Sequence, residues 1–155
     1  ARRALAFGMR GIYHNRRAAQ TDFAAELVGE DELIRRSDVL SLHAPLTQET
    51  DGAFGEAELA QMKPSAVLIN TARGPLLDEE ALVRALDSER LWGAGLDVYA
   101  REPEVHPGLI HRDDVVLLPH LGSATIECRQ EMARRALHDA LAVVHGERPR
   151  FSVGG

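Results

Sequence analysis

Apolar residues along the chain form short runs that alternate with stretches where apolar positions recur every three or four residues. A short apolar run bounded by polar or turn-forming residues is typical of a buried strand, whereas the longer period is typical of an amphipathic helix. Strands are predicted at residues 9–14, 38–45, 66–70, 92–97 and 114–120, and helices at 31–37, 55–64, after 78 and at 125–145. This alternation predicts an α/β fold with a doubly wound parallel sheet.

The helix predicted after residue 78 has a recognisable beginning. Asp78 is a candidate N-cap, and Glu79 and Glu80 occupy the first turn, where the helix dipole favours negative charge. Leu82 and Leu86 lie four residues apart and share the face that we expect to be buried. We interpret the acidic cluster as a feature of the helix start.

The first residues of the chain resemble the end of a helix. Ala4 and Leu5 precede Gly8, a typical helix stop, and neither a Met nor a capping residue stands before them. We therefore expect the sequence to begin inside an element and to be a fragment of a longer protein.

Polar residues follow four of the predicted strands at their carboxyl ends. The segments are His43-Ala44-Pro45, Asn70-Thr71-Ala72-Arg73, Asp97 and Pro119-His120. In a parallel sheet these ends lie at one edge, where open α/β sheets bind their ligands. The sequence predicts a ligand site at this edge, and the fixed charge of Arg73 favours an anionic ligand.

Arg73, Glu102 and His120 have the side chains that reduction of a 2-oxo acid requires. A guanidinium binds a carboxylate through two parallel hydrogen bonds, and a protonated imidazole supplies a proton as the carbonyl oxygen gains charge. A carboxylate beside an imidazole favours the protonated ring, and the hydride must come from a nicotinamide, because no side chain supplies one. Two of these residues also have a simpler interpretation: Arg73 paired with a neighbouring acid, and His120 as an ordinary loop residue.

Composition excludes several other classes of protein. A formal charge of −6 argues against a nucleic-acid binder, and no apolar run approaches the roughly 20 residues that span a bilayer. The single cysteine, Cys128, excludes an intrachain disulfide and favours a cytoplasmic location. The remaining histidines lack zinc-ligand spacing, so we expect no metal site.

Four ordered motifs together resemble the D-isomer-specific 2-hydroxyacid dehydrogenases: HAPLT, MKPSAVLINTARGPLLDEEALVRAL, GAGLDVYAREP and PHLGSAT. The resemblance implies a Rossmann-like fold and an NAD(P)-dependent oxidoreductase acting on a small 2-oxo acid or D-2-hydroxy acid, such as glyoxylate or hydroxypyruvate. It also implies catalytic roles for Arg73, Glu102 and His120. The cofactor-binding residues that it implies are His43, Ala44, Pro45, Thr50, Thr71, Ala72, Arg73, Asp97, His120, Gly122 and Ser123.

The chain departs from the family pattern where the glycine-rich dinucleotide motif would precede Ala1. That motif seats the pyrophosphate at a helix N-terminus, so we expect the isolated chain to be inactive. Residues 1–124 are predicted to form most of a dinucleotide-binding domain that is incomplete at its N-terminus. Residues 125–155 are predicted to form a long helix and a tail that return toward a substrate domain, and the resemblance implies a homodimer for the full-length protein.

The residues after the first predicted strand bear on the choice of cofactor. An NAD enzyme places an acid there to bind the ribose 2′-hydroxyl, but this chain has Asn15, Arg16 and Arg17. Two guanidiniums would bind a 2′-phosphate, so NADP is the preferred prediction and NAD the alternative. The simpler interpretation is that both arginines are solvated loop residues.

Three other functions remain open at this point. A relative acting on formate or phosphite is one, although the formate enzymes have glutamine in place of the acid at Glu102. A dinucleotide-sensing scaffold of the corepressor kind is another, and an inactive remnant is the third. Turnover of glyoxylate or hydroxypyruvate by the full-length protein would separate the enzyme from the scaffold.

Overall fold

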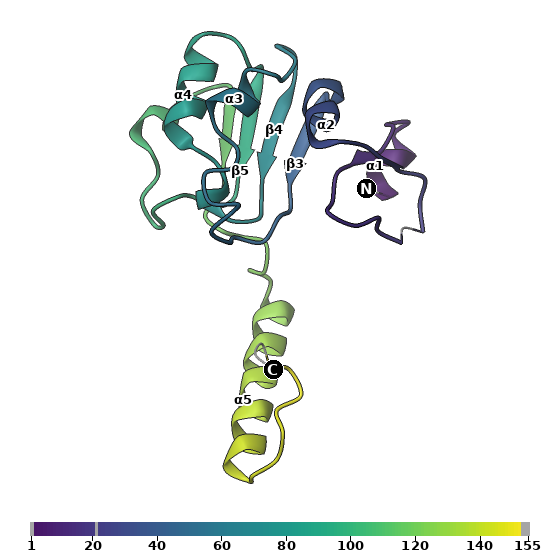
Figure 1. Cartoon of the computed structure of the whole chain (residues 1–155). Helices are drawn as coiled ribbons and strands as arrows, with labels where there is room; N and C mark the ends of the chain where they lie inside the picture. Colours follow the sequence, from purple (N-terminus) through teal and green to yellow (C-terminus); the bar gives the residue numbers. More distant parts are fainter. Residues whose placement is uncertain (1, 21, 153–155) are drawn as a thin grey trace. The chain divides into compact units, whose positions relative to one another are not determined.

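The computed structural model describes residues 2–20 and 22–152, which divide into two compact units, Ala1–Pro119 and His120–Gly155. The elements are coloured along the chain in Figure 1. In chain order they are α1 (Arg2–Ala6), β1 (Ile12–Tyr13), β2 (Glu26–Leu27), α2 (Glu30–Arg36), β3 (Val39–Leu42), α3 (Glu56–Leu59), β4 (Val67–Asn70), η1 (Gly74–Leu76), α4 (Glu79–Asp87), β5 (Gly93–Leu96), η2 (Pro107–Leu109), β6 (Val115–Leu117) and α5 (Ile126–Val144).

The main sheet of the first unit has the strand order β3-β4-β5-β6, with every neighbouring pair parallel. Leu68 and Leu96 point from its middle strands into a core that includes Leu59 of α3 and Leu82 of α4. The two helices therefore cover one face of the sheet (Figure 1). The predicted parallel sheet with packed helices is confirmed, and the carboxyl ends of its strands lie at one edge.

The beginning of the chain forms a smaller parallel sheet from β1 and β2, in which Ile12 pairs with Glu26. The strand predicted at 9–14 is shorter than expected, and the exposed β2 has no apolar run that could have predicted it. The expected helix end is confirmed, because the Gly8 N–H donates to the Leu5 carbonyl at 2.9 Å and Gly8 has a φ of 78°.

Helix boundaries in the first unit follow their capping residues. The Asp78 carboxylate accepts a hydrogen bond from the Ala81 N–H at 3.1 Å, so the predicted N-cap is confirmed. Helix α3 spans Glu56–Leu59, shorter than the predicted 55–64, because the chain turns at residues 60–64 to enter β4. Lys63 and Pro64 lie in this turn.

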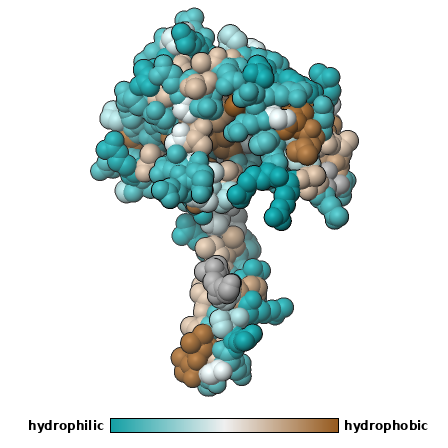
Figure 2. Space-filling view, in the orientation of Figure 1, coloured by the Kyte–Doolittle hydropathy of each residue, from teal (hydrophilic) through white to brown (hydrophobic). Residues whose placement is uncertain are grey.

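The second unit consists of α5 and a tail that folds back along it. The Thr125 hydroxyl accepts from the Cys128 N–H at 3.1 Å, so the predicted helix start is confirmed. The Asp139 carboxylate accepts hydrogen bonds from the backbone N–H groups of Arg150 and Phe151 at 3.0 and 2.8 Å. Among the described residues no helix is both long and apolar enough to cross a bilayer, and the face seen in Figure 2 is mostly hydrophilic.

Candidate active site

The turn after β4 is organised by Asn70, a residue to which the sequence pattern alone assigned no individual role. Its side chain is fully buried. The amide oxygen accepts a hydrogen bond from the Ala72 N–H at 3.1 Å, and the amide nitrogen donates to the Arg73 carbonyl at 3.0 Å. A buried amide with both groups bonded fixes the backbone between them, which explains why the strand ends in asparagine.

Gly74 brings this turn against the segment that follows β5. A Cβ atom on Gly74 would lie 1.9 Å from both the carbonyl carbon and the carbonyl oxygen of Tyr99. Only glycine permits so close an approach of two backbones. The position of Arg73, one residue earlier, is thereby fixed relative to the end of β5.

The side chain of Arg73 is exposed at the carboxyl end of β4. Its Nη1 donates to the Ala72 carbonyl at 2.6 Å, and in the part of the chain that the structure describes no carboxylate forms an ion pair with it. The simpler interpretation, in which a neighbouring acid neutralises this arginine, is therefore wrong. A guanidinium in this state can bind an anionic ligand at the edge of the sheet.

The segment after β5 holds Asp97 and Glu102. Asp97 is buried, and its N–H donates to the Asn70 carbonyl at 3.0 Å. The Glu102 Oε1 atom accepts a hydrogen bond from the Tyr99 N–H at 3.1 Å. The Tyr99 hydroxyl donates to the Leu118 carbonyl at 2.7 Å, and burial raises the pKa of this hydroxyl. These contacts place the Glu102 carboxylate next to the end of β5.

The loop after β3 contains the predicted residues His43 to Pro45 and Thr50. The His43 Nε2 atom lies 2.9 Å from the Ser41 hydroxyl. The Thr50 hydroxyl donates to the Pro45 carbonyl at 2.7 Å and accepts from the Thr47 N–H at 2.8 Å, so this side chain closes the loop.

Electrostatics links the loop after β3 to the arginines after β1. The pKa of Glu49 is lowered, first by a hydrogen bond from the Thr47 side chain and also by the positive charge of Arg16. The positive charge of Arg16 thus acts on Glu49 of this loop. Asn15, Arg16 and Arg17 are all exposed.

Most of the predicted residues of the first unit thus follow neighbouring parallel strands at one edge of the main sheet, whereas Asn15, Arg16 and Arg17 follow β1 of the smaller sheet. His43 to Pro45 follow β3, Thr71 to Arg73 follow β4, and Asp97 and Glu102 follow β5. His120, Gly122 and Ser123 belong to the second unit, where His120 has a φ of 55°. Among the described residues no group of His, Cys, Asp and Glu side chains is arranged to hold a metal ion.

An open parallel sheet with polar loops at its carboxyl edge defines the class of α/β domains that bind dinucleotides. The family model described as "D-isomer specific 2-hydroxyacid dehydrogenase, NAD binding domain" matches residues 1–122, and the chain belongs to this family. The resemblance expected from the four motifs is confirmed. The cofactor of this domain is a nicotinamide dinucleotide. Arg73, for which the described residues offer no acidic partner, suits an anionic ligand.

Several similar proteins are named as reductases. A glyoxylate reductase of Thermococcus litoralis is 45% identical over 152 residues, which are 96% of this chain and 46% of that protein. The crystal structure of a glyoxylate reductase from Paecilomyes thermophila has a TM-score of 0.88 and 47% identity, covering 95% of this chain and 46% of that one. An NADPH-dependent glyoxylate/hydroxypyruvate reductase from Sinorhizobium meliloti, solved with NADP and malonate, has a TM-score of 0.85 and 34% identity, covering 91% and 44%. The chain therefore spans about half the length of these relatives.

Proposed function

We propose that the whole protein reduces a small 2-oxo acid, such as glyoxylate or hydroxypyruvate, to the D-2-hydroxy acid with NADPH or NADH. The observation that carries the proposal is the guanidinium of Arg73, which is exposed at the carboxyl end of β4 and has no acidic partner in the part of the chain that the structure describes. The names of the similar reductases from Thermococcus litoralis and Paecilomyes thermophila support the substrate class. We also propose that the whole protein is a homodimer, as the resemblance to the family implies. We propose a cytoplasmic location, in keeping with the single free Cys128.

Three residues share the catalytic work in this proposal. Arg73 binds the substrate carboxylate through its two parallel N–H groups and polarises the neighbouring carbonyl. His120 donates a proton to the carbonyl oxygen, and Glu102 favours the protonated imidazole through its negative charge. The bound nicotinamide supplies the hydride. The family motifs that contain Glu102 and His120 support these roles.

Replacement of Arg73 tests the proposed function. In the whole protein we expect Arg73→Ala to lower kcat/KM for glyoxylate by roughly 100-fold, because bonds to a charged group contribute about 1.5–3 kcal/mol each and solvent weakens them. Arg73→Lys should recover part of the loss, since it keeps the charge without the planar fork. Steady-state kinetics with varied glyoxylate and varied NADPH measures both effects.

The control for this experiment is Arg90→Ala, which removes another exposed arginine that lies just after α4. We expect this variant to keep the activity of the unaltered protein. The KM for NADPH should change little in Arg73→Ala. Undiminished glyoxylate reduction by Arg73→Ala would contradict the assignment of Arg73 as the carboxylate anchor.

We further propose that NADP is the preferred cofactor, held by Arg16 and Arg17 beside the uncharged Asn15. The NADP-bound relative from Sinorhizobium meliloti supports this choice. Charge-assisted bonds to a 2′-phosphate, reduced by solvent exposure, should leave a net preference of about 1.5–3 kcal/mol. This corresponds to a kcat/KM for NADPH that is roughly 10- to 150-fold higher than for NADH.

Kinetics with both cofactors at low and high salt measures this preference. It should shrink as salt rises, because exposed charges are screened. A variant with Asn15→Asp, Arg16→Ser and Arg17→Ser should prefer NADH, whereas Arg10→Ser serves as a control that removes a neighbouring arginine. Equal kinetics for the two cofactors would show that Arg16 and Arg17 are only solvated loop residues.

A further inference from the structure

We propose that helix α4 positions the Glu102 loop, and that Glu79 is a positioning residue for the reaction. The inference rests on the proposed catalytic role of Glu102 and adds a function for the acidic start of α4. The sequence alone indicates that the cluster of Asp78, Glu79 and Glu80 is the start of a helix, here α4. Asp78 does cap the helix, but Glu79 and Glu80 also bind the connection between β5 and β6.

The first attachment lies directly beside Glu102. The Ala100 N–H donates to the Glu79 Oε1 atom at 2.7 Å, and the preceding N–H, that of Tyr99, donates to the Glu102 Oε1 atom at 3.1 Å. Two consecutive backbone N–H groups are therefore held by two different carboxylates. These two N–H groups belong to adjacent peptide planes that meet at the Tyr99 Cα atom, so the bond to Glu79 also restricts the backbone from which the Glu102 side chain is held.

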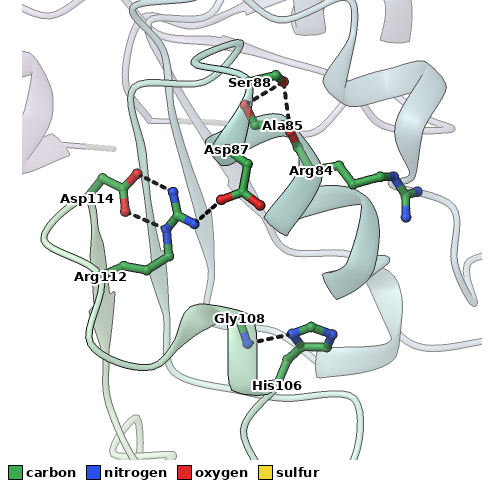
Figure 3. A network of polar contacts seen from close by, with 8 residues as sticks. All are labelled: Arg84, Ala85, Asp87, Ser88, His106, Gly108, Arg112 and Asp114. Carbon is green, nitrogen blue, oxygen red and sulfur yellow. Dashed lines mark hydrogen bonds and ion pairs between the residues drawn. The ribbon is translucent and has the colours of Figure 1, made fainter.

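The second attachment joins Glu80 to His106. The Gly108 N–H donates to the His106 Nδ1 atom at 3.1 Å, and the opposite ring atom, Nε2, lies 2.9 Å from the Glu80 carboxylate. Because Nδ1 accepts a hydrogen bond, Nε2 carries the ring proton and donates a hydrogen bond to the Glu80 carboxylate. Figure 3 shows the hydrogen bond between the Gly108 N–H and the His106 ring. The ring fastens the far end of the Glu102 loop to the helix.

Two more contacts continue along the same helix. A Cβ atom on Gly108 would lie 2.9 Å from the Val83 Cγ1 atom, so η2 packs tightly against α4. The Arg112 guanidinium donates to Asp87 at 2.5 Å and to Asp114 at 2.8 and 2.9 Å (Figure 3), and this hydrogen bonding lowers the pKa of Asp114.

The four attachment points on α4 share one side of the helix. Glu79, Val83 and Asp87 follow each other at intervals of four residues, with Glu80 beside them. A helix is a rigid support, and catalytic groups act best when neighbouring contacts hold their geometry. We infer that this row of side chains limits how far the Glu102 carboxylate can move, and that Glu79, the contact nearest to it, has the largest effect.

The test compares three replacements of Glu79 in the whole protein. Glu79→Asp keeps the negative charge at the helix start but shortens the side chain by one methylene, so that it no longer reaches Ala100. We expect Glu79→Asp and Glu79→Ala to lower kcat for glyoxylate roughly 3- to 10-fold, in the range of one lost hydrogen bond. Glu79→Gln keeps an acceptor at full length and should retain kcat close to that of the unaltered protein.

The pH dependence of kcat/KM provides a readout that a purely structural role would not change. Reduction needs a protonated imidazole, so kcat/KM falls as pH rises. A displaced Glu102 carboxylate favours the protonated ring less, so the fall in kcat/KM should move to lower pH. The matched control is Glu56→Ala, which removes the first glutamate of α3 and its bond to Arg84 at 3.1 Å. It should leave both kcat and the pH profile unchanged.

Glu102→Gln, measured in parallel, distinguishes a failure of the positioning role of Glu79 from a failure of the catalytic role of Glu102. If Glu102→Gln moves the pH profile and Glu79→Asp matches the Glu56→Ala control, the positioning role is overturned and the catalytic proposal stands. If Glu102→Gln leaves the rate and the profile unchanged, the catalytic role of Glu102 fails and the positioning proposal fails with it. A shifted profile in Glu79→Asp, with an unaltered unfolding midpoint, is the supporting result.

Discussion

Replacing Gly74 with alanine is expected to lower the free energy of unfolding by more than about 4 kcal/mol, a loss that few single substitutions produce. The added Cβ would lie 1.9 Å from the Tyr99 carbonyl carbon and oxygen and 2.4 Å from the Ala100 nitrogen. Ordinary overpacking costs about 1–3 kcal/mol because side chains can move aside. Here the obstacle is backbone next to a strand of the central sheet, so the turn itself must move.

Denaturant unfolding of the chain, followed by circular dichroism, measures this loss. Gly29→Ala is the matched control, because Gly29 has a φ of −66° and no heavy atom within 4 Å of an added Cβ. We expect Gly29→Ala to change the free energy of unfolding by no more than about 1 kcal/mol. Alanine is a weaker N-cap than glycine, which destabilises the helix, but it also makes the unfolded chain less flexible, which stabilises the fold. A Gly74→Ala variant as stable as this control would contradict the close approach of the two backbones.

Replacement of His120 by asparagine is expected to lower kcat for glyoxylate reduction by roughly 10²–10⁴ in the whole protein, the usual contribution of a positioned acid or base. His120 has a φ of 55°, in the left-handed region that few residues other than glycine adopt. Asparagine tolerates this conformation, so His120→Asn removes the proton donor and keeps the backbone. Steady-state kinetics at saturating NADPH measures the loss.

His111 provides a control with the same backbone feature, because its φ is 63° and its side chain is also exposed. His111→Asn should leave kcat unchanged and should alter stability about as much as His120→Asn. Backbone strain at functional sites is common, but strain alone does not establish function. Equal kcat values for His120→Asn and the unaltered protein would mean that His120 is not the proton donor.

Local patterns in the sequence were sufficient for most of the helices and strands. The apolar run ending at Asn70 predicted β4, and the capping side chains of Asp78 and Thr125 predicted where α4 and α5 begin. Capping bonds and buried runs depend on neighbours close in the chain, so a sequence shows them directly. The four motifs, the one around Arg73 among them, likewise indicated the family from the sequence, and the family model confirms it.

Elements that depend on distant partners could not be predicted in this way. Strand β2 is Glu26–Leu27 and is exposed, so only its pairing with β1 makes it a strand. The same is true of η1 and η2, each three residues long and too short to show a period. Each is nevertheless packed against a distant segment, since Gly74 of η1 contacts Tyr99 and Gly108 of η2 contacts Val83.

The sequence by itself determined which residue types are available at the strand ends, and the arginine, glutamate and histidine of the proposed site are among them. Only the tertiary structure decided that Arg73 has no acidic partner among the described residues, that Gly74 must be glycine, and that Glu79 binds the segment beside Glu102. The physical reason is that these properties depend on which residues about twenty or more positions apart come into contact, as Gly74 does with Tyr99 and Glu79 with Ala100, and which do not. Such contacts exist only once the sheet and α4 have brought the two segments together.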